Sequence, residues 1–175
     1  MTSAAVAESE PVQASDAVEH EDVAARWAAT TLITAPTASE VEHLARRIHA
    51  ASSRAAYPFV QTSAAALPVK PRALLEACAA LIEAAAGGTL LLTAVEEMPA
   101  IAQDRFSETL AELHSSRAPS VAVRLIAGTT VSLRERIADG AFSERLFYRL
   151  NIIHVVKAVP TRGNSGHERR AFNPS

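Results

Sequence analysis

Cysteine, lysine and glycine are all scarce in this sequence of 175 residues. The single cysteine, Cys78, excludes an internal disulfide and a metal site built from cysteines, and it is consistent with a reducing compartment. It lies in the helical-looking run ALLEACAALIEAA, where cysteine behaves as a small buried apolar residue. No apolar run is long enough to span a bilayer, and no basic region precedes an apolar stretch at the N-terminus. These absences predict a cytoplasmic protein.

Charge is also low, and it has no dominant sign. Charged residues make up 21% of the chain and the formal net charge is −2, so there is no electrostatic reason to expect DNA or an anionic membrane as a partner. The six histidines show no paired metal-ligand spacing, and no G-x-S-x-G nucleophile elbow occurs. Hydrophobic residues reach 49%, which is enough to bury the core of one domain. We therefore expect a globular domain without a metal site.

The composition changes at both ends of the chain. Residues 1–26 are rich in Ala, Ser, Glu and Asp, with no Lys or Arg before Arg26, which predicts a flexible acidic tail. Residues 161–175 are polar and interrupted by Gly and Pro, which predicts a flexible polar tail. The folded domain is expected to span residues 27–160. Trp27, just before the first strand pattern, is expected to anchor the N-terminal segment on the core.

Between the tails, strand patterns alternate with helix patterns. The strand patterns fall at residues 30–35, 58–64, 89–95, 121–129 and 151–159. The helix patterns fall at residues 39–51, 71–86, 100–116 and 132–140. The third strand, TLLLT, is apolar on both faces, which is typical of a central strand in a parallel sheet. The alternation predicts an α/β domain with a mainly parallel five-stranded sheet flanked by helices.

Three segments carry a family likeness: RRIHAASSRAAYPFVQTSAAALP (46–68), GGTLLLTAVEEMP (87–99) and VAVRLIAGTTVSLRERIADGAFSERLFYRLNII (121–153). They resemble the AAA+ domain of bacterial sigma-54-dependent transcription activators, the enhancer-binding proteins. That family typically reads AIHxxSxRxxxPFVxxNCAALP, then GGTLFLDEIGELP, then IAATNRDL and GRFREDLYYRLNV. The resemblance covers residues 30–160 in the family's order. It implies an AAA+/P-loop NTPase-like core.

The turn before the first helix departs from the family. A phosphate-binding loop needs glycines that let backbone N–H groups approach the phosphates, and a lysine that reaches the terminal ones. The family has GESGTGKE here, whereas this chain has APTASEVE at residues 35–42, and all six of its glycines lie at Gly87 or beyond. Thr37 to Glu40 match a helix capping box instead, with Thr37 or Ser39 at the helix start. We therefore expect no phosphate cradle.

The acids that follow the third strand also differ. In the family, an Asp-Glu pair holds magnesium and orients the attacking water. Thr93 and Ala94 stand at these positions, and Glu96 and Glu97 follow two or three residues too late. The family's polar sensor, an asparagine, falls on Thr130. The departures imply a degenerate domain with no catalytic residue, no bound ATP or magnesium, and no enzyme activity.

The arginines of the family's FREDLYYRL segment reach into the nucleotide site of a neighbouring subunit. Here the first becomes Ser143 and the second persists as Arg149. The resemblance makes Phe142, Glu144 and Arg149 the candidates for a subunit interface. Arg149 is expected to pack against Glu144 or a neighbouring chain rather than to take part in catalysis.

Two regions that the family uses for partners have no counterpart here. The GAFTGA loop that contacts sigma-54 is inserted between the second and third strands. In this chain only residues 69–86 lie between Pro68 and Gly87, and they read as one helix. Direct contact with sigma-54 is therefore not expected. The family's helical lid and C-terminal helix-turn-helix would follow the fifth strand, and residues 161–175 match neither.

Together these observations favour a catalytically inactive domain that serves as a regulatory or protein-interaction module in bacterial transcription or signalling. Its expected partner is an intact AAA+ activator, or a second copy of itself. Two alternatives stay open at this point. One is a divergent ATP-binding regulator with an unrecognised site, and the other is a truncated paralogue without a selected activity.

Overall fold

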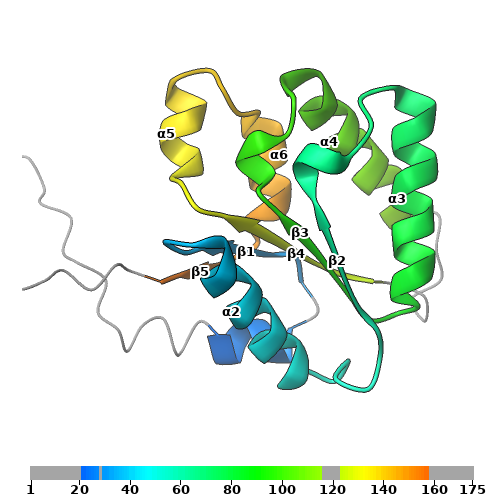
Figure 1. Cartoon of the computed structure of the whole chain (residues 1–175), viewed down its shortest axis with the longest axis vertical. Coiled ribbons are helices and arrows are strands. Elements are labelled where there is room, and N and C mark those ends of the chain that lie inside the picture. The colour runs from blue at the N-terminus through cyan, green and yellow to red at the C-terminus, as the bar shows by residue number, and fades with distance from the viewer. Residues whose placement is uncertain (1–20, 28, 116–122, 158–175) are drawn as a thin grey trace, which may run out of the picture.

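The computed structural model describes residues 21–27, 29–115 and 123–157, and its centre is a twisted sheet (Figure 1). The strands are β1 (Thr31–Thr34), β2 (Phe59–Ser63), β3 (Thr89–Thr93), β4 (Arg124–Thr129) and β5 (Ile153–Val156). They lie in the order β2-β3-β4-β1-β5, and every pair is parallel. The predicted α/β fold with a parallel five-stranded sheet is confirmed.

Helices connect the strands where the periodicity predicts them. They are α2 (Ala38–Ala50), α3 (Pro71–Ala85), α4 (Ala100–Ser115), α5 (Leu133–Ala138) and α6 (Glu144–Leu150). Of these five helices, α6 is the one without a predicted helix pattern. Its N-cap is Ser143, whose hydroxyl accepts a hydrogen bond from the backbone N–H of Leu146.

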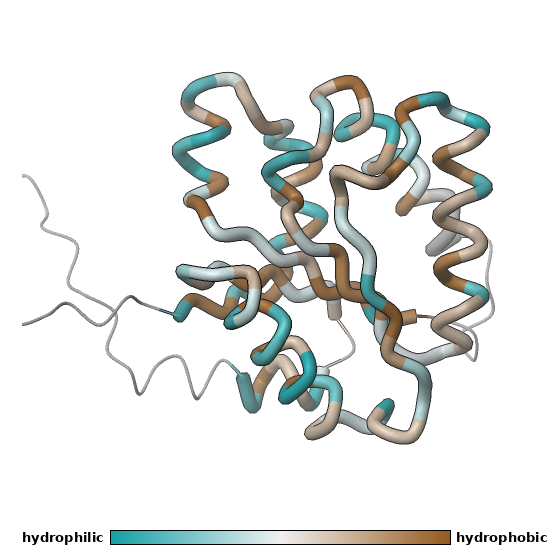
Figure 2. The backbone as a smooth tube through the Cα atoms, viewed as in Figure 1, coloured by the Kyte–Doolittle hydropathy of each residue, from teal (hydrophilic) through white to brown (hydrophobic). Residues whose placement is uncertain are grey.

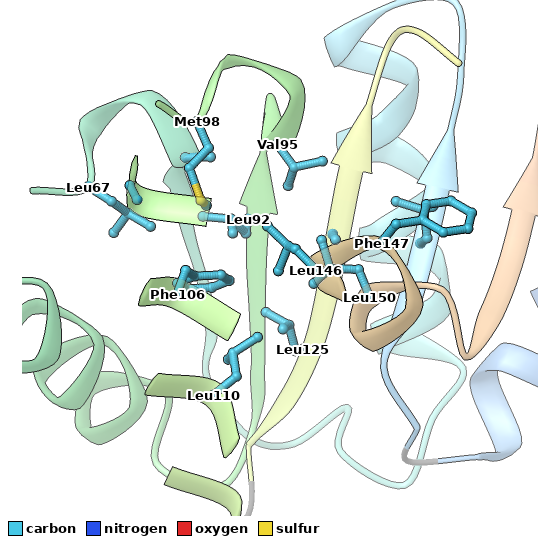
Figure 3. Close-up of a cluster of buried hydrophobic side chains, with 14 of the residues drawn as sticks. Leu67, Leu92, Val95, Met98, Phe106, Leu110, Leu125, Leu146, Phe147 and Leu150 are labelled. Carbon is cyan, nitrogen blue, oxygen red and sulfur yellow. The ribbon is translucent and has the colours of Figure 1, made fainter. Parts of the chain in front are cut away.

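Two apolar clusters cover the two faces of the sheet. On one face, α3, α4 and α6 pack over Leu92 and Leu125, with Phe106 and Phe147 among the buried side chains (Figure 3). On the other face, α2 packs over Ile33, Leu91 and Ile126. In the hydropathy colouring, the central strands are largely hydrophobic (Figure 2). The alternation of Leu90, Leu91 and Leu92 between the clusters confirms that β3 is buried on both sides.

The N-terminal boundary differs from the prediction. Residues 21–26 are helical, and Ala24 is fully buried in the cluster beneath α2. Glu21 also pairs with Arg47 of α2 at 3.0 Å. The acidic tail predicted for residues 1–26 is therefore wrong for its last six residues, while residues 1–20 and 161–175 lie outside the described part of the chain. Trp27 is 66% exposed and does not anchor the segment; small alanines do so because they fit closely against the sheet.

The amino ends of the strands enclose a buried arginine. Arg124, 1% exposed, donates through its guanidinium to the carbonyl of Ala24 and, at 3.2 Å, to the hydroxyl of Thr31. Burial, and then the nearby guanidinium of Arg54, lower the pKa of Arg124 to about 10. The residue is thus still charged at neutral pH, and its acceptors are a helix-end carbonyl and a hydroxyl.

On the α2 face, β4 and α2 approach closely at a glycine. A Cβ added at Gly128 would lie 2.2 Å from Cγ1 of Val41. Val41 is 1% exposed, and its β-branched side chain has little rotamer freedom within a helix. Glycine at position 128 therefore sets how closely α2 lies over the sheet.

We expect Gly128→Ala to destabilise the fold by about 1–3 kcal/mol, since the added methyl group overpacks the contact with Val41. Val41→Ala should also destabilise on its own, because it removes buried methyl groups. The double variant should cost at least about 1 kcal/mol less than the sum of the two single changes. Urea unfolding measures all three values. The control is Val41→Ala combined with Ile101→Ala, at a site that is 70% exposed, and these two changes should be additive. Additive effects of Gly128→Ala and Val41→Ala would contradict the contact between positions 128 and 41.

A second prediction concerns pH. Burial, together with the guanidiniums of Arg124 and Arg46, holds the pKa of His49 below its usual 6.5, so the folded state favours the neutral imidazole. As the pH falls below 6.5, the unfolded chain takes up this proton first. The stability contributed by neutral His49 should therefore decline until the pH reaches the lower pKa of the folded state.

The free energy of unfolding, measured in urea between pH 7 and 5, should depend less on pH in His49→Gln than in the wild type. Glutamine is chosen because its amide can still bond the hydroxyl of Thr89, which lies 2.9 Å from Nδ1 of His49 in the wild type. His43→Gln, at an exposed position of the same helix, is the control and should leave the decline in place. Identical curves for the two variants would show that His49 is not responsible.

Candidate functional site

The carboxyl ends of β1, β3 and β4 form the edge where open parallel sheets bind ligands. Thr34 and Thr129 lie opposite each other in the register of β1 and β4, so the loops that follow begin side by side. The structure brings together at this edge most of the residues singled out in the sequence. They are Thr37 and Ser39 at the start of α2, Thr93 and Ala94 after β3, and Thr130 after β4.

The turn between β1 and α2 is a capped helix start. Thr37 is the N-cap, with φ −137° and ψ 153°, and its hydroxyl oxygen accepts from the backbone N–H of Glu40 at 3.2 Å. The same hydroxyl donates to Oε2 of Glu40 at 3.0 Å. Ser39 lies in the first turn and is not the cap. The capping box read from the sequence is therefore confirmed at Thr37.

Glu40 places a negative charge at the N-terminus of α2. Nζ of Lys157, just after β5, lies 3.0 Å from Oε1 of Glu40, and the backbone N–H of Lys157 donates to the carbonyl of Thr34. The hydrogen bond from Lys157, followed by that from Thr37, lowers the pKa of Glu40. The sequence gives no sign of this pair, because Lys157 reaches the turn only through the pairing of β5 with β1.

Val41 follows Glu40 and points the other way, into the core. When APTASEVE is set against GESGTGKE, Val41 stands at the position of the lysine. Its side chain is 1% exposed and belongs to the apolar cluster between α2 and the sheet. The residue at this position therefore contributes to packing.

The chain after β3 turns sharply. The hydroxyl of Thr93 donates to the carbonyl of Thr62 in the neighbouring strand at 3.3 Å. Ala94 has a left-handed backbone, with φ 52°, a conformation that costs an alanine about 1–2 kcal/mol. A short 3₁₀ turn, η2 (Val95–Glu97), follows and buries Val95.

This turn carries Glu96 to the end of the adjacent strand. Oε1 of Glu96 accepts from the backbone N–H of Thr130 at 3.0 Å and from the hydroxyl of Thr130 at 2.9 Å. Oε2 of Glu96 is buried without a hydrogen-bond partner. The sequence singles out Glu96 and Thr130 separately but does not predict their contact. The contact could be found only from the adjacency of β3 and β4 in the sheet.

The three candidate interface residues lie on or beside α6 (Figure 1). Phe142 is only 5% exposed and belongs to the core cluster, so its prediction as an interface residue is wrong. An apolar ring next to α4 and α6 gains more from burial in its own chain. Glu144 is exposed and Arg149 is half-buried, and no ion pair joins them among the described residues.

Other kinds of site find no support in the described part of the chain. It contains no group of three or more His, Cys, Asp or Glu side chains that could hold a metal ion. No helix within the described ranges is long and apolar enough to cross a membrane. Cys78 is buried, and burial raises the pKa of its thiol to about 11, so it is not a reactive thiolate at neutral pH.

Comparison with known proteins agrees with this architecture. The sigma-54 interaction domain matches the chain over residues 7–79 and 73–156. The regulatory protein AtoC of Escherichia coli strain K12 is 35% identical over 149 residues, which cover 73% of this chain and 32% of AtoC. The chain thus spans about a third of the length of this curated relative.

Solved structures give the same result. The structure of NtrX from Brucella abortus in complex with ATP has a TM-score of 0.64 and 30% identity, and the match covers 85% of this chain and 38% of NtrX. The P-loop NTPase domain of an Escherichia coli sigma-54 activator has a TM-score of 0.61 at 19% identity, a likeness of fold, with 84% of this chain and 95% of that domain covered. With its parallel sheet and the match along most of its length, the chain belongs to the family of the sigma-54 interaction domain.

Proposed function

We propose that this chain is a non-catalytic member of its family, a regulatory or protein-interaction module of bacterial transcription that does not use ATP. The observation that carries the proposal is the burial of Val41 against β4, at the position where the resemblance places the phosphate-binding lysine. A buried apolar side chain cannot supply charge to a phosphate.

Charge at the carboxyl edge supports the same proposal. At the N-terminus of α2 the hydroxyl of Thr37 accepts from the backbone N–H of Glu40, and after β4 the carboxylate of Glu96 accepts from the backbone N–H of Thr130. Both are positions where backbone donors would otherwise be free for an anion. The carboxylate of Glu96 opposes a nucleotide triphosphate there, while that of Glu40 is paired with Nζ of Lys157.

The residues after β3 support the absence of magnesium chemistry. Thr93 and Ala94 carry no carboxylate, and the hydroxyl of Thr93 is engaged with the carbonyl of Thr62. Glu96 is the nearest acid that follows, and one of its oxygens is engaged with Thr130. A hydrated Mg²⁺ held with substrate phosphates normally needs one or two protein carboxylates, so we propose that this edge holds neither Mg²⁺ nor ATP.

The proposed partner is an intact AAA+ activator or a second copy of this chain. The segment between η1 (Ala64–Ala66) and β3 contains the single helix α3, so we do not propose direct contact with sigma-54 through a GAFTGA loop. The exposed side of α6 offers Glu144, the 63% exposed Tyr148 and the half-buried Arg149 to a neighbouring chain. Exposed tyrosine and arginine side chains are common anchors in protein interfaces.

The purified chain should show no saturable binding of Mg-ATP at millimolar nucleotide in a calorimetric titration, because buried Val41 stands at the position of the phosphate-binding lysine and Glu96 occupies the N–H of Thr130. NtrX from Brucella abortus, whose structure was solved with ATP, is the positive control. Saturable binding that Thr37→Ala or Ser39→Ala abolishes would contradict the proposal and favour a divergent ATP-binding regulator.

Sedimentation should show that the chain associates with itself or with a purified activator that has an intact AAA+ domain. Arg149→Glu should weaken that association about tenfold or more, since it reverses the charge at the proposed contact. Arg72→Glu is the matched control on α3, where the side chain is 92% exposed and far along the chain from α6. A strict monomer that binds no activator would contradict the proposed function.

A further inference from the structure

We propose that the side chain of Glu96 links the loop after β3 to the loop after β4. The carboxyl edge of the sheet therefore keeps one conformation when no nucleotide is present. This inference rests on the proposed function, because it describes how a domain without ATP holds its former ligand edge together. We call the contact between Glu96 and Thr130 the Glu96 clasp.

The clasp is made by one oxygen and two donors. Oε1 of Glu96 accepts from the backbone N–H of Thr130 at 3.0 Å and from its hydroxyl at 2.9 Å. Hydrogen bonds to an ionised carboxylate are stronger than those between neutral groups. Because both donors belong to Thr130, the pair fixes the backbone and the side chain of that residue at once.

The rest of Glu96 shows that the contact is specific. Its other oxygen, Oε2, is buried and has no hydrogen-bond partner, an arrangement that opposes burial of the carboxylate. The two bonds to Thr130 therefore account for its position.

The backbone turns after β3 and after β4 bring Glu96 and Thr130 together. The left-handed conformation of Ala94 turns the chain out of β3 so that η2 can present Glu96 towards β4. Beyond β4, the hydroxyl of Thr129 donates to the carbonyl of Val131 and accepts from the N–H of Val131, both at 3.2 Å. Thr130 is thus held in a tight turn, with its amide directed at Glu96.

The clasp has a consequence for the surface that a partner meets. The loop that contains Thr130 leads directly to Ser132, which caps α5, and α5 is followed by α6 with Glu144 and Arg149. Fixing Thr130 therefore fixes the start of the segment that carries the proposed interface. A partner would meet the same surface whatever the nucleotide concentration.

Hydrogen exchange at the amide of Thr130 tests the clasp directly. Thr130 is exposed, and Glu96 is the acceptor of its N–H, so loss of the carboxylate should speed exchange of this amide about tenfold or more. The experiment compares wild type, Glu96→Ala and Glu96→Gln by NMR. Glu97→Ala, an exposed glutamate in the same turn, is the matched control and should change the rate less than twofold. Glu96→Gln, which keeps an acceptor oxygen, should retain most of the protection.

Equal rates in Glu96→Ala and Glu97→Ala would overturn the clasp. If Glu96→Ala does not fold, Thr130→Val and Thr130→Ser replace it, and Val should loosen the loop more than Ser because only Ser keeps the hydroxyl bond to Glu96. Adding Mg-ATP to wild type distinguishes the two proposals. A change in the Thr130 amide with nucleotide would overturn both the proposed function and a ligand-independent edge, whereas an unprotected amide that ignores nucleotide would overturn the clasp alone.

Discussion

A guanidinium buried under the amino ends of the strands, that of Arg124, is the contact on which the arrangement of this domain depends. A buried charge is stable only where the surrounding groups satisfy it. Here the acceptors are the carbonyl of Ala24, at the end of a helical segment, and the hydroxyl of Thr31 in β1. The segment at residues 21–26 is thus joined to β4 and β1, although Ala24 and Arg124 are 100 positions apart. Without that carbonyl, the charge of Arg124 would lose its main acceptor.

The two edges of the sheet follow the same principle with opposite charge. At the amino edge the guanidinium of Arg124 donates to a carbonyl and a hydroxyl. At the carboxyl edge Glu40 accepts from the hydroxyl of Thr37 and pairs with Lys157, and one oxygen of Glu96 accepts from the N–H and hydroxyl of Thr130. In each case the chain supplies both members of the contact. An α/β sheet of this kind often leaves its carboxyl edge open for a ligand. Here the polar groups of that edge bond one another, which is consistent with a domain whose role is to present a surface.

The features that could be predicted from the sequence are those set by short-range pattern. TLLLT predicts a strand buried on both faces, and Thr37 with Glu40 predicts a helix cap, because each depends on residues close in the chain. The missed features all depend on distant partners. The carbonyl of Ala24 meets Arg124 from far along the chain, the position of Lys157 depends on the pairing of β5 with β1, and the contact of Glu96 depends on the adjacency of β3 and β4. The placement of Phe142 at an interface failed for the same reason, since its burial comes from the packing of α4 and α6.

The proposed absence of nucleotide chemistry is more than the loss of a few side chains. Val41 packs against Gly128 in the core, so a lysine at position 41 would have to carry its ammonium group out of an apolar contact to reach a phosphate. The start of α2 would also need to change, because the hydroxyl of Thr37 already accepts from the N–H of Glu40 in its first turn. Acids at positions 93 and 94 would in turn lie beside Glu96, and like charges there would oppose one another. Under the proposed function, several coupled changes would therefore be needed before this edge could bind ATP, and the change at position 41 would disturb a contact within the core.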